Sequence, residues 1–300
     1  MLARLQQTIT LSLLAAALAW LLLFWGRSPL LACAGLVLFV KGYSVFLAME
    51  FMALRFVNQR DPVPQPGWGE LLGAWWGETL TAPRVFCWRQ PFWSNAVPDA
   101  LAPASAVQGR RGVVFIHGFV CNRGLWTPWL RELRARGHAF AAVNLEPVFG
   151  SIDDYVPQIE DAVQQVTRAT GLPPVLVCHS MGGLAARAWL KARAADARVH
   201  HVITIGSPHH GTWLGRFSLV VNGRQMRLGS DWLRRLEQDT PAQRHARFTC
   251  WYSNCDNIVF PASTATLAGA DNRLVRGVAH VQLAFDAAVM RASLALITAV

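Results

Sequence analysis

The C-terminal two-thirds of the chain alternates short apolar segments with longer amphipathic ones. The apolar segments predict β-strands over Val113–Ile116, Phe140–Asn144, Val175–Cys178, His201–Ile205 and Phe248–Tyr252. The amphipathic segments between them predict helices over Leu125–Arg136, Ile152–Thr170, Gly183–Arg193 and Ser230–Gln238. Because strands and helices alternate, residues 110–300 are expected to form an α/β domain, with a mostly parallel sheet and helices on both faces.

The first 60 residues are far more apolar than the rest. The run from Thr8 to Trp25 carries no charge and is long enough to cross a bilayer as a helix. A second run, Leu30 to Phe51, is interrupted by Lys41, which has to snorkel or face protein to be tolerated. We therefore expect residues 1–60 to be a membrane anchor of one or two transmembrane helices. A cleaved signal peptide is the alternative, although no small-residue cleavage site clearly follows the long first run.

The arginines bear on the orientation of this anchor. Arg4 precedes the first run and Arg27 lies between the two, whereas a larger group follows the second run: Arg55, Arg60, Arg84 and Arg89. Since cytoplasmic segments carry the excess of positive charge, this distribution favours a hairpin with both ends in the cytoplasm. If only the first run spans, the domain faces outward.

Residues 61–109 are rich in proline and aromatic residues. Asp61–Gly67 reads as a stiff connector, and a dense aromatic group follows it: Trp68, Trp75, Trp76, Trp88, Phe92 and Trp93. Aromatic residues favour the membrane interface, and Trp68–Trp76 is open to that role as well as to packing. Arg84–Trp88 is instead expected to begin the sheet of the domain.

A serine follows the predicted strand at 175–178. In the segment Cys178-His179-Ser180-Met181-Gly182, a strand, a tight turn and a helix-forming run succeed one another. This is the context of a nucleophile elbow, G-x-S-x-G, in which a strained turn exposes the serine hydroxyl. Cys178 stands where glycine is usual. An ordinary strand-to-helix turn is the alternative interpretation.

Three further segments supply what a nucleophilic serine needs. A predicted strand ends in His117-Gly118-Phe119, so the backbone N–H groups of Phe119 and Met181 would form an oxyanion hole. Asp256 follows the strand at 248–252, and His280 precedes the last predicted helix. The order Ser180, Asp256, His280 suits a triad in which His280 is the general base. Taken alone, Asp256 could be a turn residue and His280 a surface histidine.

Together these segments resemble bacterial lipases and esterases of the α/β-hydrolase superfamily, close to the triacylglycerol-lipase branch. The resemblance runs from about Arg110 to the C-terminus and includes Gly206-Ser207-Pro208-His209-His210-Gly211-Thr212, similar to the family's Gly-Thr-Pro-His-x-Gly-Thr signature. It implies an α/β-hydrolase fold and hydrolysis of carboxylic, acyl or lipid esters through an acyl-serine. It also places the anchored protein at a bacterial inner membrane, and the segment 213–240 resembles the lid region.

Other activities remain open at this point. An acyltransferase or a thioesterase would use the same triad, and the departure at Cys178 leaves room for a catalytically silent, membrane-tethered module. His209 and His210 have no third ligand at a suitable spacing, so we expect no metal and no cofactor.

Charge and cysteine content add little to this picture. The net charge of +10 comes mostly from arginine and suits anionic headgroups, but no nucleic-acid recognition motif accompanies it, so no nucleic-acid partner is expected. The six cysteines follow no disulfide framework, although Cys250 and Cys255 could pair in an oxidising space. The sequence does not indicate an oligomeric state.

Overall fold

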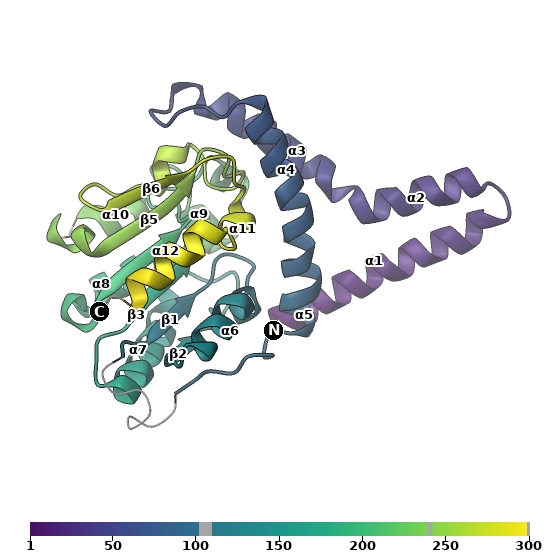
Figure 1. Cartoon of the computed structure of the whole chain (residues 1–300). Coiled ribbons are helices and arrows are strands. Elements are labelled where there is room, and N and C mark those ends of the chain that lie inside the picture. Colours follow the sequence, from purple (N-terminus) through teal and green to yellow (C-terminus); the bar gives the residue numbers. More distant parts are fainter. Residues whose placement is uncertain (102–109, 239, 241, 299–300) are drawn as a thin grey trace.

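A six-stranded parallel sheet organises the part of the chain after residue 110 (Figure 1). The computed structural model describes residues 1–101, 110–238, 240 and 242–298. Within them the strand order is β2-β1-β3-β4-β5-β6. Their bounds are β1 (Val113–Ile116), β2 (Phe140–Ala142), β3 (Val175–His179), β4 (His201–Ile205), β5 (Phe248–Ser253) and β6 (Asp271–Val275). The central position of β3 places the turn that follows it in the middle of the carboxyl edge of the sheet.

Helices cover both faces of the sheet, because alternate strand residues point to opposite sides. On one face, Val113, Val175 and Ile203 share a buried apolar cluster with α6 (Thr127–Ala135) and α12 (Ala287–Thr298). On the other face, the cluster joins Val114, Leu176 and the three helices α7 (Val156–Thr170), α8 (Met181–Arg193) and α10 (Asp231–Gln238). Apart from the partly exposed edge strand β6, the strands are buried on both faces, as is usual for parallel sheets.

The sequence predicted five of these strands and the four helices between them. The bounds differ by a few residues, since Leu125–Arg136 becomes a 3-10 turn, η4 (Arg123–Trp126), followed by α6. β6 was missed because only its last two residues, Leu274 and Val275, are apolar. The strand expected at Arg84–Trp88 is wrong: these residues form the π-helical turn η2 (Arg84–Arg89), which continues α4 (Trp68–Pro83). Residues 102–109 and 239 of the predicted segments lie outside the described residues.

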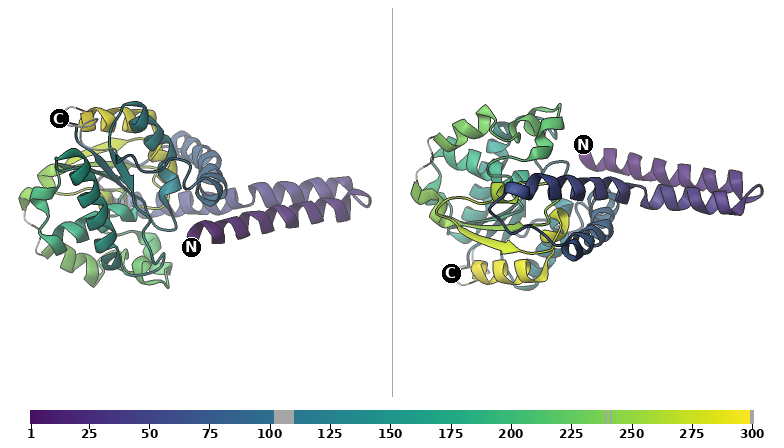
Figure 2. Two further views of the ribbon diagram at one scale, coloured as in Figure 1. Left: turned by 90° about the horizontal axis from the view of Figure 1, so that it is seen from below. Right: turned by 90° about the horizontal axis from the view of Figure 1, so that it is seen from above.

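The N-terminal helices form a hairpin that projects from the domain (Figures 1 and 2). α1 (Leu2–Trp25) leads away from the domain, and α2 (Pro29–Lys41) returns beside it. The turn between them is fixed locally, because the Ser28 hydroxyl accepts a hydrogen bond from the N–H of Leu31 and Pro29 occupies the first helical position. Next follow α3 (Tyr43–Val57) and α4, after which the short helix α5 (Gln90–Phe92) leads to the domain.

Two described helical segments are long and apolar enough to span a membrane, Leu2–Trp25 and His280–Thr298. The second comprises α11 (His280–Leu283) and α12, whose residues Val289, Leu294 and Ile297 are buried in the sheet core. The predicted second run, Leu30 to Phe51, is divided between α2 and α3, which pass the same test only as a pair bent by 49°. Lys41, at the end of α2, is exposed and lies 5.8 Å from the centre of the Trp76 ring of α4, so an aromatic ring accompanies its charge.

Candidate active site

Ser180 occupies a strained turn between β3 and α8. Its backbone has φ 54° and ψ −129°, a left-handed conformation that a non-glycine residue rarely adopts. The serine N–H is held by the carbonyl of Ile205 at 2.9 Å. At Gly182 a Cβ would lie 2.3 Å from the carbonyl oxygen of Ile116, so only glycine fits where the chain crosses itself. These are the features of the elbow predicted from the sequence.

Cys178, the departure from the glycine pattern, is a fully buried member of the apolar core. Burial raises the pKa of its thiol well above the ordinary value. The side chain therefore packs as a small apolar group, and the turn forms with cysteine at this position.

Asp256 and His280 meet above the carboxyl ends of β4 and β5. His280 Nδ1 lies 2.9 Å from Asp256 Oδ2, and both residues are buried. Asp256 Oδ1 accepts hydrogen bonds from the N–H groups of Ile258 at 3.0 Å and Val259 at 2.7 Å. Asp256 is thus a turn residue and a partner of the histidine at once. Since a carboxylate only accepts, Nδ1 carries the proton and Nε2 has the lone pair of a base.

Gly206 sits at the centre of this arrangement. A Cβ there would lie 2.9 Å from Asp256 Oδ2 and 3.2 Å from His280 Nδ1, and its φ of +57° also favours glycine. Its neighbour Ile205 binds the N–H of Ser180, so β4 connects all three predicted residues. Among the described residues no hydrogen bond joins the Ser180 hydroxyl to His280, a geometry that often tightens only when substrate binds.

Charge around His280 favours its protonated form. Burial alone lowers the pKa of this histidine, but Asp256, Glu78 and Glu50 outweigh it and raise the pKa above the ordinary value. The ring of His179 lies 4.6 Å from that of His280. Burial and His280 hold the pKa of His179 well below its ordinary value, so His179 stays neutral.

The loop with the predicted oxyanion donors borders the serine directly. A Cβ at Gly118 would lie 2.6 Å from the Cβ of Ser180, so glycine allows the close approach. Phe119 is the next residue of this loop. Met181 begins α8, and the first N–H groups of a helix lack an intrahelical partner. Both donors named from the sequence therefore belong to segments next to Ser180.

His117 braces this loop. Its Nδ1 lies 2.9 Å from the carbonyl oxygen of Gly118, and its Nε2 accepts the N–H of Leu145 at 3.0 Å. Burial lowers the pKa of His117 to about 4. With both ring nitrogens occupied, His117 has no lone pair available for a substrate.

Three other side chains that could serve as a base or an acid have partners of their own. His209 is buried with its Nε2 3.1 Å from the hydroxyl of Thr204. Asp231 pairs with Arg234 on the exposed side of α10, and Asp271 pairs with Arg273 in β6. No group of three or more histidine, cysteine, aspartate or glutamate residues in the described ranges could hold a metal ion. The six cysteines are thiols, Cys250 and Cys255 included.

Two glutamates next to the site were not singled out from the sequence. Glu50 of α3 accepts a hydrogen bond from the Asn257 side chain, and Glu78 of α4 accepts from the backbone after His280. The signal that could have found them is an acidic residue inside an otherwise apolar or aromatic segment.

Residues 213–240, expected to resemble a lid, begin beside the acid loop. They contain the 3-10 turn η7 (Trp213–Phe217) and α9 (Val221–Gln225), followed by α10. The Trp213 ring stacks on Phe260, with centroids 5.8 Å apart. Leu219 is 87% exposed, so the outer side of this segment presents apolar side chains to its surroundings.

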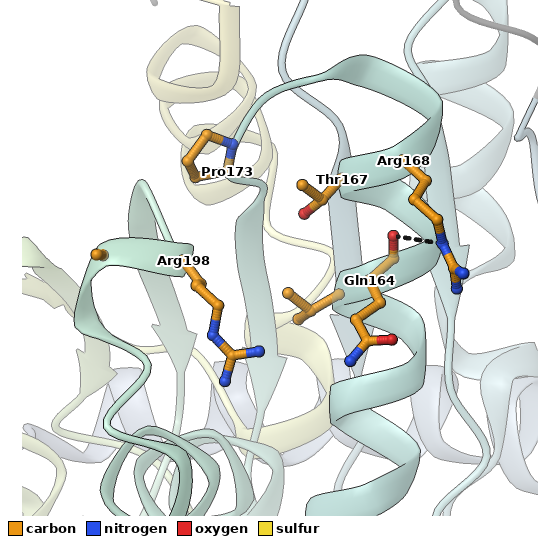
Figure 3. A pocket seen from close by; sticks show the side chains of 7 residues that line it. Gln164, Thr167, Arg168, Pro173 and Arg198 are labelled. Carbon is orange, nitrogen blue, oxygen red and sulfur yellow. Dashed lines mark hydrogen bonds between the residues drawn. The ribbon is translucent and has the colours of Figure 1, made fainter.

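A surface cavity lies away from this site. It has a volume of about 350 Å³ and lies between α7 and the segment before β3, with Gln164, Thr167, Pro173 and Arg198 in its lining (Figure 3). Pro173 precedes β3, whereas Ser180 follows it, so this cavity is at the opposite edge of the sheet. It belongs to no part of the candidate active site.

The sequence and the fold place the chain in a known family. Residues 113–298 match a model described as "Alpha/beta hydrolase family". The chain belongs to the alpha/beta hydrolase family, since this match covers more than half of its length. Among curated proteins no sequence matches it.

Solved structures share this fold. The mature form of a Bacillus licheniformis lipase superposes with a TM-score of 0.56 and 17% identity, covering 65% of this chain and 94% of the other. Lipase B of Aspergillus fumigatus superposes with a TM-score of 0.53 and 17% identity, covering 61% of this chain and 51% of the other.

Substitution of Gly182 tests the elbow. We expect Gly182→Ala to destabilise the protein by about 1–3 kcal/mol, because the added methyl group overlaps the Ile116 carbonyl. Thermal unfolding of the full chain measures this. Gly69→Ala is the matched control, since a Cβ at this exposed glycine meets nothing within 4 Å. Equal stability of the two variants would contradict the crowded crossing.

Proposed function

We propose that this protein is a serine hydrolase that cleaves acyl esters, lipid esters among them, and is anchored in a membrane. The observation that carries the proposal is the buried Asp256–His280 pair at 2.9 Å, beside a serine held at positive φ between β3 and α8. Membership of the alpha/beta hydrolase family and the likeness in fold to two lipases agree with it.

In the proposed mechanism Ser180 is the nucleophile. Its hydroxyl oxygen attacks the ester carbonyl carbon while His280 Nε2 takes the proton, and Asp256 stabilises the resulting imidazolium. The oxyanion accepts hydrogen bonds from the N–H groups of Phe119 and Met181. The bond to the leaving alcohol then breaks as His280 returns the proton to it, which leaves an acyl-serine.

Water completes the reaction. It attacks the acyl carbon while His280 takes one of its protons, and the proton then returns to the Ser180 oxygen as the carboxylic acid leaves. Transfer to another alcohol instead of water would follow the same steps, so the products distinguish a hydrolase from an acyltransferase.

The proposed membrane location rests on the N-terminal hairpin. Its outward side chains are almost wholly apolar, among them Leu11, Leu14, Leu18 and Leu22 of α1 and Leu30, Val37 and Leu38 of α2. Water disfavours such a surface by about 25 cal/mol per Å² of apolar area, whereas the bilayer interior accepts it. Exposed Trp68, Leu72 and Trp76 on α4 continue the apolar surface toward the domain.

Loss of Ser180 or His280 is the direct test of the enzyme. Ser180→Ala and His280→Ala are each expected to reduce hydrolysis of a p-nitrophenyl ester by about a thousandfold or more, because the triad acts as a unit. Labelling by a fluorophosphonate probe should also disappear in Ser180→Ala. A folded wild-type protein that neither labels nor hydrolyses esters would favour the silent module.

The acidic limb of the activity profile follows from His280. The base must be unprotonated, and its pKa is raised above the ordinary value of 6.5. Protonation therefore persists to a higher pH, and kcat/KM should fall to half its plateau at a pH above 6.5 as the solution is acidified. Initial rates between pH 5 and 9 measure this limb, and a midpoint below 6.5 would contradict the charge balance described here.

The hairpin predicts where the two chain ends lie. A reporter that fluoresces only in the cytoplasm should be active at either terminus, because α1 and the second apolar run, which begins with α2, would cross the membrane in opposite directions. The protein should also stay with membranes after alkaline washing and be released by detergent. Fluorescence from only one of the two fusions would indicate a single span.

A further inference from the structure

The N-terminal helices contact three of the four segments that carry the proposed catalytic groups, namely the oxyanion loop, the acid loop and the histidine loop. On the oxyanion loop, the buried Gln6 of α1 donates a hydrogen bond to the carbonyl oxygen of Val120 at 3.3 Å. Val120 follows Phe119 and has a φ of 53°, so this contact holds a strained residue beside a proposed oxyanion donor.

The contact of α4 with the histidine loop is the most direct. Glu78 is 2% exposed, and its two carboxylate oxygens accept the N–H groups of Val281 and Gln282, each at 3.0 Å. Val281 and Gln282 are the two residues directly after His280. Gly77 permits the close approach, since a Cβ there would lie 2.3 Å from the Gln282 side chain.

α3 reaches the same histidine through the acid loop. Glu50 Oε2 accepts a hydrogen bond from the Asn257 side-chain nitrogen at 2.6 Å. The Asn257 side-chain oxygen in turn accepts the N–H of His280 at 3.2 Å. The Asn257 side chain thus connects Glu50 with His280, and Asn257 is also the chain neighbour of Asp256.

An apolar cluster fixes these contacts in place. It consists of buried residues from α3 and α4 together with residues of the two catalytic loops: Phe51, Leu54, Leu71, Ala74, Cys255, Phe260 and Ala279. The N-terminal helices and the loops therefore share one core, so the two glutamates have little freedom to move away from His280.

Burial makes these carboxylates costly, which argues for a role beyond packing. Removing an ion from water costs several kcal/mol unless its partners repay it. Burial raises the pKa of Glu78 to about 7 even though two N–H groups and His280 oppose that change. The titratable groups that face His280 are Asp256, Glu50, Glu78 and the neutral His179.

We propose that Glu78 and Glu50 are positioning residues for His280, so that α3 and α4, the helices that follow the N-terminal hairpin, are an integral part of the active centre. These contacts hold the backbone on either side of the His280 imidazole, and the carboxylates in their ionised form stabilise the imidazolium. This inference rests on the proposed function, because it assigns His280 the role of general base.

The test compares glutamine variants of the full-length protein in detergent. In Glu78→Gln the amide nitrogen cannot accept an N–H, and the negative charge is lost. We expect kcat to fall by about tenfold to a hundredfold with KM nearly unchanged, because a small misplacement of a catalytic group has this effect. The acidic limb should also move to lower pH, because loss of a nearby negative charge lowers the pKa of His280. Glu50→Gln should show a smaller fall in kcat and a smaller shift of the acidic limb.

Glu70→Gln is the matched control. Glu70 lies on the same helix and binds Arg276 at 2.8 Å, just before the histidine loop, but it does not contact His280, Val281 or Gln282. Its kcat and acidic limb should match those of the wild type. Near-ultraviolet circular dichroism checks the fold of each variant. If Glu78→Gln does not fold, the positioning role is tested with Glu50→Gln, through its kcat and the midpoint of its acidic limb.

Each result separates the two proposals. If the glutamine variants keep the wild-type kcat and the same midpoint of the acidic limb of the pH profile, the positioning role is overturned. Labelling of Ser180 by the probe would in that case still support Ser180 as the nucleophile. A fall in kcat without a change in the midpoint of the acidic limb would mean that the glutamates are only structural, and would overturn the positioning role. A fall in kcat equal to that of Glu70→Gln would have the same meaning. A wild-type chain that the fluorophosphonate probe does not label would refute both proposals together.

Discussion

The arrangement of the domain depends on one strained residue, Ser180, at the end of the central strand. A positive φ is unfavourable for serine, so the surroundings have to impose it. They do so through the Ile205 carbonyl, which binds the serine N–H, and through Gly182, which lets the chain cross beneath Ile116. The parallel order of β1, β3 and β4 brings these partners together. The sheet thus holds the turn, and the turn determines where the other loops must converge.

Local patterns predicted most of the domain. Apolar runs bounded by turn residues identified five strands, and order along the chain identified Ser180, Asp256 and His280 as candidates. The edge strand β6 escaped because it begins with three polar residues, Asp271–Arg273, and an exposed edge strand needs no continuous apolar run. Arg84–Trp88 was misassigned because aromatic and branched residues suit a strand, whereas here they continue α4 as a helical turn.

The features that could not be predicted are long-range ones. Glu50 and Glu78 bond partners about two hundred positions away, the Asn257 side chain and the N–H of Val281, and no local pattern links an acidic residue to such distant groups. Gly206 is a similar case. The sequence motif that contains it was recognised, but glycine is required there because the side chains of Asp256 and His280 lie so close. Sequence patterns thus located the candidate groups, whereas only the tertiary structure identifies what surrounds them.

The shared cluster of Phe51, Leu71, Phe260 and Ala279 has a consequence for biosynthesis. The helices that contribute its first half leave the ribosome long before the loops that contribute the second. Until those loops have been synthesised, Glu50, Glu78 and the apolar side chains of α3 and α4 lack their final neighbours. This cluster can therefore close only after the acid and histidine loops have been synthesised and have packed against α3 and α4.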